Sequence, residues 1–398
     1  MTSPSSDEQQ PWILSVRLDR LAGTATFVRS DRKQAVFEVG SSVDPTSSIV
    51  ATTWVPKANA MAFETDRGDS VVAELPTVDD LAPLNGRPVV YLDQNQWSTL
   101  ANVVHAPERL TVAEGEAAEA LIDMAAASKV VLPLSAGHMS ETCKWTNRDR
   151  RYALALTILK LSRGWQMRDP LELRRSEIRR ALLARYRDEH PAQPAPFTLE
   201  PEALHGPNRD RGPFVAPADF PEDYALTFRA QTSIASAFDV MLDAEHIEVG
   251  PSPGWVERFQ GFTDWLGAQP RDNRRLRHSR TDAFFLSDIL NEVAAECPRA
   301  GITAEEMSDW TLNHSSDDIS VMPSLGLFRE AMREKLLNPG TRWEDNDLAD
   351  LMYLTCGAGY SDHVVAERSF ASQIDRAVRR LGRTPNVHRN LFELLAAL

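Results

Sequence analysis

Residues 88–93 read Pro-Val-Val-Tyr-Leu-Asp, a nearly continuous apolar run that ends on an acid. A run of this length and composition predicts a strand that is buried on both faces, as in a parallel sheet. The residues after it predict a helix at 94–104, a second helix at 112–127 and another apolar strand at 129–134. Because apolar strands alternate with helices here, the sequence indicates a parallel α/β core that begins near residue 85.

The chain before this core has a different hydrophobic pattern. Short β-type runs alternate with Gly, Pro, Asp and Ser at 12–18, 25–28, 35–39 and 70–75. Such short, alternating runs predict a small antiparallel unit. The first ten residues, MTSPSSDEQQ, are polar and predict a disordered tail.

The chain after residue 145 interrupts the core and later returns to it. Residues 146–188 have a helical pattern, and eight prolines in 190–222 predict a wrapping loop. Further helices are predicted at 223–243, 253–268, 281–296, 325–337, 346–356 and 369–381, and a strand at 363–366. The predicted division is a tail at 1–10, a small β-rich domain at 11–80, a core in two halves at 84–145 and 321–398, and a helical insertion at 146–320.

Composition limits the classes of protein that this chain can represent. Of the 398 residues, 42% are hydrophobic and 25% are charged, which excludes a wholly disordered chain. No apolar run approaches the ~20 residues of a membrane span, and no secretory leader is recognisable, so we expect no membrane partner. Three widely separated cysteines argue against a disulfide framework. Together these features predict a cytoplasmic protein.

Acidic residues stand where a parallel sheet usually presents its chemistry. Asp93 ends the first core strand, and ligands of open α/β sheets bind outside the carboxyl ends of the strands. Glu141 follows the second predicted strand by seven residues. Asp347 and Asp350 are three residues apart and therefore share one face of a predicted helix.

The last predicted strand is flanked by two further acids, Asp362 before it and Glu367 after it. Carboxylates within ~4 to 6 Å of one another raise each other's pKa, and a hard divalent cation neutralises them. Oxygen ligands without His or Cys favour Mg²⁺ or Mn²⁺, which can activate water and stabilise the leaving oxygen of a phosphodiester. The sequence thus predicts a metal-dependent hydrolase. Its predicted catalytic metal ligands are Asp93, Glu141, Asp347, Asp350 and Asp362, with Glu367 as a further metal ligand.

Four segments together resemble the PIN-domain nucleases. They are Val89-Val-Tyr-Leu-Asp-Gln-Asn-Gln-Trp97, Glu141, the helix start Asn346-Asp-Leu-Ala-Asp350, and Tyr360-Ser-Asp-His-Val-Val-Ala-Glu-Arg-Ser-Phe370. The resemblance covers 85–145 and 322–385. It implies a PIN-like parallel sheet flanked by helices, an acidic Mg²⁺ or Mn²⁺ site, and an endonuclease that cleaves RNA in preference to DNA. The family includes toxin ribonucleases, which makes a toxin or defence role an expectation.

The resemblance also assigns family positions to single residues. Asp93 matches the family's first acid, Glu141 the second, and Asp347 or Asp350 the third, whereas Asp362 and Glu367 share the region of the fourth. The chain departs from the family pattern at the last position, where Ala366-Glu367 replaces a Thr-x-Asp type of context.

A nucleic-acid partner must be reconciled with the acidic balance of the chain. Lys and Arg number 43 against 57 Asp and Glu, a net charge of −14, so the whole molecule does not attract phosphate. Two basic stretches, 174–187 and 271–280, hold six and five arginines. We therefore predict nucleic-acid contacts from Asn95, Arg174, Arg175, Arg179, Arg274, Arg275 and Arg277. The alternative is a solvated basic face on an amphipathic helix.

A second function stays open at the level of sequence. Asp93 can simply cap the following helix, and acids in a first helical turn are favoured by the helix dipole without any metal. The alternative is therefore a catalytically degenerate PIN-like scaffold that acts as a binding or assembly module. It would contact a protein partner, or a second copy of the chain, through the N-terminal β unit or the helical insertion.

Overall fold

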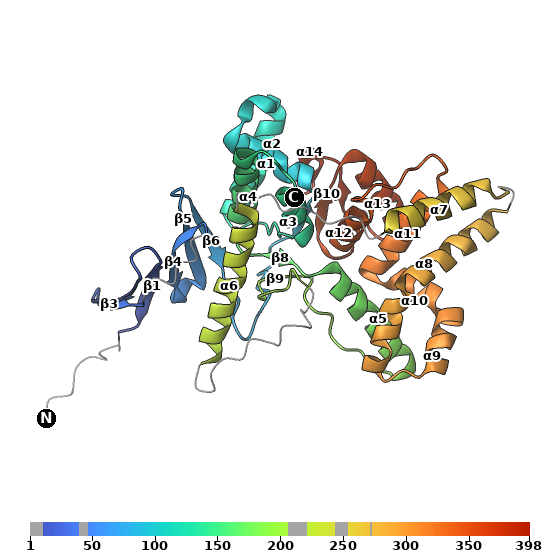
Figure 1. Cartoon of the computed structure of the whole chain (residues 1–398), viewed down its shortest axis with the longest axis horizontal. Helices are drawn as coiled ribbons and strands as arrows, with labels where there is room; N and C mark the ends of the chain where they lie inside the picture. The colour runs from blue at the N-terminus through green and yellow to red at the C-terminus, as the bar shows by residue number, and fades with distance from the viewer. Residues whose placement is uncertain (1–10, 40–46, 206–220, 243–253, 271–272) are drawn as a thin grey trace.

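The computed structural model describes residues 11–39, 47–205, 221–242, 254–270 and 273–398. An antiparallel sheet at the N-terminus is followed by a largely helical body with a small parallel sheet (Figure 1). The predicted mixed α/β class and the N-terminal β unit are confirmed. The predicted tail at 1–10 and part of the proline-rich stretch, 206–220, lie outside the described residues.

The N-terminal sheet has six strands in the order β3-β2-β1-β4-β5-β6, and neighbouring strands are antiparallel. The strands are β1 (Ile13–Asp19), β2 (Thr24–Arg29), β3 (Gln34–Glu38), β4 (Ile49–Val55), β5 (Ala60–Thr65) and β6 (Ser70–Glu74). Four of them coincide with the predicted runs, whereas β4 and β5 were not predicted. Side chains of β5 alternate, and Met61 and Phe63 are buried, because successive residues of a strand face opposite sides.

The parallel sheet has the order β11-β10-β7, with β7 (Val90–Leu92), β10 (His363–Val365) and β11 (Val387–His388). The strand predicted at 129–134 is not formed. That segment makes isolated parallel bridges instead, from Val131 to Val89 and from Leu134 to Gln166. Pro133 has no backbone N–H to donate, which explains why a continuous ladder does not form there.

Helices make up most of the remaining chain. Their bounds are α1 (Gln94–His105), α2 (Val112–Ala126), α3 (Ala136–Cys143), α4 (Arg148–Ser162), α5 (Pro170–Tyr186), α6 (Glu222–Leu242), α7 (Trp255–Ala268), α8 (Arg274–Glu296), α9 (Ala304–Asp309), α10 (Ser315–Val321), α11 (Pro323–Leu337), α12 (Asp347–Tyr360), α13 (Arg368–Arg380) and α14 (Leu391–Leu395). A two-stranded pair, β8 (Gln166–Met167) and β9 (Phe197–Thr198), lies between α4 and α6 in the chain. Within the described ranges, no helix combines the length and apolar character needed to cross a bilayer.

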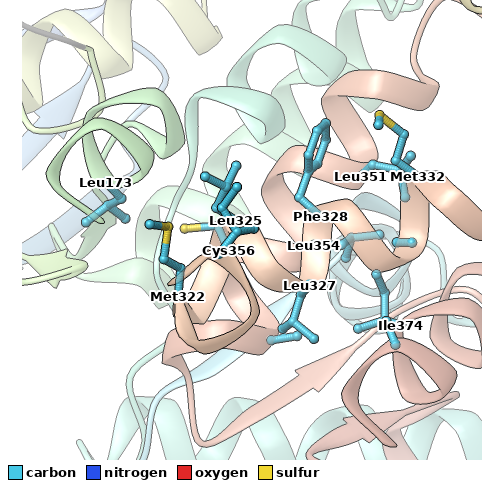
Figure 2. Packing of buried hydrophobic residues seen from close by; sticks show 14 of the residues in the cluster. Leu173, Met322, Leu325, Leu327, Phe328, Met332, Leu351, Leu354, Cys356 and Ile374 are labelled. Carbon is cyan, nitrogen blue, oxygen red and sulfur yellow. The ribbon is translucent and has the colours of Figure 1, made fainter. Parts of the chain in front are cut away.

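The parallel sheet has a hydrophobic core on each face. Val90, Leu92 and Val365 belong to one core, which also contains residues of α1, α2, α4 and α6. Val89 and Tyr91 belong to the other, which contains residues of α5, α8, α11, α12 and α13. Apolar residues of α11 and α12 pack together in the second core (Figure 2). Alternate residues of one apolar strand thus serve two cores, as the run at 88–93 predicts.

The N-terminal sheet shares the first of these cores. Ile49, Phe63 and Val71 are buried in the same cluster as Val90 and Leu92 of the parallel sheet. Phe63 packs on Phe238 of α6, with ring centroids 5.2 Å apart. Residues 11–80, predicted as a small separate domain, therefore lie against α4 and α6 of the predicted insertion (Figure 1).

Candidate functional site

A cavity of about 320 Å³ contains the predicted acids that the fold brings together. The carboxyl end of β7 supplies Asp93, α3 supplies Glu141, the start of α12 supplies Asp350, and Glu367 precedes α13. One cation, Lys144, lines the same cavity. Segments more than 200 residues apart in the chain thus place four carboxylates and one ammonium group around one space.

Asp93 links the carboxyl ends of β7 and β10. Its backbone N–H donates to the Val365 carbonyl at 2.9 Å, and its side chain accepts from the N–H of Gln96 at 3.0 Å and of Glu367 at 2.5 Å. The residue therefore caps α1, as its position after an apolar strand allows. Burial raises the pKa of Asp93 to about 6 against the lowering effect of these hydrogen bonds, and the Glu367 charge adds to the rise.

Helix α3 carries Glu141 into the cavity. Its first turn is held by a reciprocal cap in which the Ser135 hydroxyl accepts from the His138 N–H and His138 Nδ1 accepts from the Ser135 N–H. His138 Nε2 also lies 2.8 Å from the Leu92 carbonyl, which ties the helix to β7. Burial raises the pKa of Glu141 to about 7, and the Asp350 charge contributes to this rise.

Helix α12 carries Asp350 because it approaches both β7 and α3 closely. A Cβ added at Gly357 would lie 2.6 Å from Tyr91 Cδ1, and one added at Gly137 of α3 would lie 2.9 Å from Tyr353 Cδ2. Glycine at both positions is what permits these approaches. Burial raises the pKa of Asp350 to about 6, and the charges of Asp347 and then Asp93 raise it further.

Asp93, Glu141 and Asp350 form an electrostatically coupled group. The Asp93 charge raises the pKa of both other carboxyls, and Asp350 raises the pKa of Glu141, whereas Lys144 lowers the pKa of Glu141 and Asp350. Among the described residues, neither Glu141 nor Asp350 forms an ion pair or side-chain hydrogen bond, so no protein cation directly compensates them. Like charges without compensation favour protonation or the binding of a cation.

A buried acceptor without a partner lies in the same cavity. Gln94, the first residue of α1, is 9% exposed and donates from Nε2 to the Thr142 hydroxyl at 3.0 Å. Its Oε1 has no hydrogen-bond partner among the described residues. A buried unsatisfied oxygen costs about 1–3 kcal/mol unless water or a ligand binds it.

Two predicted site residues lie elsewhere. Asp362 precedes β10 and accepts from the Val89 N–H at 2.7 Å, at the amino end of the sheet, whereas Asp93 lies at the carboxyl end. The length of the strands separates these two ends, so Asp362 does not belong to the site. Asp347 is paired with Lys335 and accepts from the Glu344 N–H at 2.5 Å, so it acts on the cavity only through its charge on Asp350.

Several predicted nucleic-acid contacts serve the fold instead. Arg174 is 4% exposed, pairs with Glu292 at 2.9 Å and lies over the Phe328 ring, and Arg277 is buried and donates to the Leu266 carbonyl at 2.8 Å. The prediction of phosphate contacts from these two residues is wrong for that reason. The other predicted contacts lie as follows: Arg179 pairs with the buried Glu296 at 3.3 Å, Arg175 is partly buried, Arg274 and Arg275 are exposed on the first turn of α8, and Asn95 lines the acidic cavity.

The donor set suits a hard divalent cation, although it is not closed around one. In the described part of the chain, no three Asp, Glu, His or Cys side chains form a group that could hold a metal ion. Mg²⁺ is commonly held by only one or two carboxylates and keeps several of its waters. Asp93, Glu141 and Asp350 are all oxygen donors, which favours Mg²⁺ or Mn²⁺ over zinc.

Comparisons with protein-family models, with curated proteins and with solved structures find no match to this chain. The function of the chain is therefore inferred from the residues of the site.

Several polar residues that line the cavity were not predicted from the sequence. Lys144 lies one helical turn after Glu141, Asn346 precedes α12, and Gln94 follows Asp93 directly. Lys144 Nζ donates to Asn346 Oδ1 at 2.6 Å and so links α3 to α12. The i to i+3 spacing of Glu141 and Lys144 is the signal that would have found the lysine, because residues three apart share a helix face.

Proposed function

We propose that this protein is a divalent-metal-dependent endonuclease, acting on RNA in preference to DNA, whose site is formed by Asp93, Glu141 and Asp350. The observation that carries the proposal is that three carboxyls from three elements line one cavity, where burial raises the pKa of each and the Asp93 charge adds to the rise at Glu141 and Asp350. A fold retains such repulsion where a function requires it, and perturbed acids in a cavity are the usual sign of a functional site. The preference for RNA and the PIN-like character of the core come from the resemblance of the sequence.

In this proposal the carboxylates bind the metal ion and Lys144 positions the substrate. Asp93 is fixed by two backbone N–H donors, so its carboxylate is already oriented. Glu141 and Asp350 would complete the oxygen ligands. When bound, Mg²⁺ or Mn²⁺ supplies an activated water and charge stabilisation at the phosphodiester. Lys144, next to Glu141, would contact a phosphate oxygen and orient the substrate.

Cleavage of a fluorogenic single-stranded RNA in Mn²⁺ tests this function. We expect Asp93→Asn and Asp350→Asn each to lower the rate by about 100-fold or more, because each removes an oxygen ligand next to the scissile bond. Asp345→Asn is the matched control, since Asp345 is an exposed acid that does not line the cavity. Equal rates for the wild type and Asp93→Asn, in two independent preparations, would refute the assignment.

One observation favours the alternative of a degenerate scaffold. The described residues hold no closed group of three metal ligands, and the last family position carries Glu367 next to Ala366. A scaffold would bind partners but would show no metal-dependent cleavage and no gain in melting temperature with Mn²⁺. Both readouts are available from the same purified protein.

A further inference from the structure

A second cavity, of about 420 Å³, adjoins the acidic cavity and differs from it in charge. The two share Glu141, Lys144 and Asn346. The lining that belongs only to the second cavity is Trp145, Thr146, Asn147 and Arg150. Because the two cavities share these three residues, the carboxylates of the first lie beside the cations, amide groups and indole of the second.

The local sequence explains why these groups face the same space. Helix α3 ends with the Lys144 N–H donating to the Glu141 carbonyl at 3.2 Å and the Trp145 N–H donating to the Thr142 carbonyl at 3.2 Å. Asn147 then caps α4 by accepting from the Arg150 N–H at 3.0 Å. The end of one helix and the start of the next thus place the acid, the cations and the indole within consecutive turns.

The second cavity has the chemistry of a site for a phosphate chain with exposed bases. Lys144 and Arg150 supply positive charge, and the N-terminus of the 15-residue α4 adds the positive end of its dipole. Trp145 lines this cavity and is 37% exposed, so part of its indole is accessible to a ligand. Cations beside an exposed aromatic ring are how proteins hold unpaired nucleotides, because the ring stacks on a base and the cations contact the backbone.

We propose that this second cavity binds an unpaired stretch of nucleic acid, with a base stacked on Trp145 and its flanking phosphates on Lys144 and Arg150. The proposal rests on the proposed function, since it makes the cavity the approach that leads the next phosphodiester to Asp93, Glu141 and Asp350. A base inside a duplex cannot stack on a side chain, so the substrate is single-stranded at this point. Because the net charge of −14 gives the whole molecule no attraction to phosphate, binding depends on the two cations of this local patch.

Binding without cleavage tests the inference separately from catalysis. The probe is a fluorescein-labelled 12-nucleotide single-stranded RNA, and its anisotropy is measured with the full chain in EDTA. We expect Trp145→Ala to weaken binding by about 10-fold or more through the lost stacking, and Trp145→Phe to retain most of the affinity. Arg150→Gln should weaken binding and also reduce its dependence on salt.

Matched controls share the residue type and exposure but lie outside the two cavities. Trp12→Ala removes an indole that is 43% exposed next to β1, and Arg109→Gln removes an exposed guanidinium from the segment after α1. Both should bind within about twofold of the wild type. A duplex of the same sequence should bind more weakly than the single strand.

The outcomes distinguish the two claims. Unchanged binding by Trp145→Ala, duplex binding as tight as single-strand binding, or no binding by the wild type would each overturn the inference. If Trp145-dependent binding is found but no Mn²⁺-dependent cleavage, the binding cavity stands and the proposed function fails. If cleavage is lost in Asp93→Asn but is unaffected by Trp145→Ala, the proposed function stands and the binding cavity fails.

Discussion

At the scale of single residues, the site is distinguished by carboxyls that are less acidic than usual. The pKa of Asp93 and of Asp350 is raised to about 6, and that of Glu141 to about 7, mainly by burial. In the unfolded chain these groups titrate near 4. Since the folded state then binds more protons between about pH 4 and pH 7, the stability that these groups contribute is present at low pH and is lost as the pH rises through 6 to 7.

This direction of the pH dependence of stability gives a prediction for Asp350→Asn. At pH 7.5 without metal, the variant should be more stable than the wild type by about 1 kcal/mol, because it removes an ionised carboxylate that repels Glu141. At pH 4.5 the difference should approach zero, since Asp350 is then largely protonated in the folded wild type. Urea unfolding at both pH values measures it. A variant that is less stable than the wild type at pH 7.5 would contradict the coupling.

Part of this residue-level chemistry could be predicted from the sequence. Asp93 and Glu141 were identified because they follow strand-like segments, and both line the cavity. The sequence could not show which of Asp347 and Asp350 faces the cavity. Asp347 is held away by an ion pair with Lys335 of α11, a contact between distant segments of the chain. Asp362 does not line the cavity, because it precedes its strand and the ligand crevice of such a sheet lies at the carboxyl ends of the strands.

At the scale of elements, the site depends on how closely α3 and α12 approach each other. Gly137 of α3 faces Tyr353 of α12, and any larger side chain at residue 137 would meet the tyrosine ring. These two helices carry Glu141 and Asp350. Helix packing therefore sets the distance on which both the repulsion and any shared ion depend.

Gly137→Ala should accordingly damage the site through packing alone. We expect a loss of stability of about 1 kcal/mol, because overpacking outweighs the higher helix propensity of alanine. We also expect a smaller gain in melting temperature on adding Mn²⁺, since the two carboxylates are pushed apart. Gly115→Ala in α2 is the control, because a Cβ there meets nothing within 4 Å. If both variants respond to Mn²⁺ like the wild type, the α3–α12 spacing does not govern the site.

Elements were predicted well where the pattern was periodic and poorly where it was not. The helices at 94–104, 112–127 and 325–337 agree with α1, α2 and α11 to within two residues. The apolar segment 129–134 has the composition of a strand, but Pro133 limits it to bridges. Composition alone does not show which backbone groups will be paired.

At the scale of the whole molecule, the acidic balance is distributed unevenly. Many arginines of the basic stretches are bound to acids within the fold, as Arg174 is to Glu292 and Arg179 to Glu296. These residues therefore do little to attract phosphate. The local charge contrast between the two joined cavities, which involves Lys144 and Arg150, was not predicted because it depends on the turn between α3 and α4.

The arrangement of the hydrophobic cores could not be predicted from the sequence either. The predicted boundary near residue 80 follows a change in texture, yet Phe63 on β5 packs with Phe238 on α6 in a core shared with β7. Such contacts join segments more than 170 residues apart and leave no local periodic signal. The N-terminal sheet and the parallel sheet therefore support each other through α4 and α6.

The most direct test of the metal site is calorimetric titration of the full chain with Mn²⁺ at pH 7.5. The account predicts saturable binding in the wild type and in Asp345→Asn, and binding weakened by about 10-fold or more in Asp350→Asn, which lacks one of the coupled carboxylates. The affinity of the wild type should fall as the pH is lowered from 7.5 to 5.5, because protons compete for the same oxygens. Saturable binding that is identical in the wild type and Asp350→Asn, or no saturable binding in either, would contradict it.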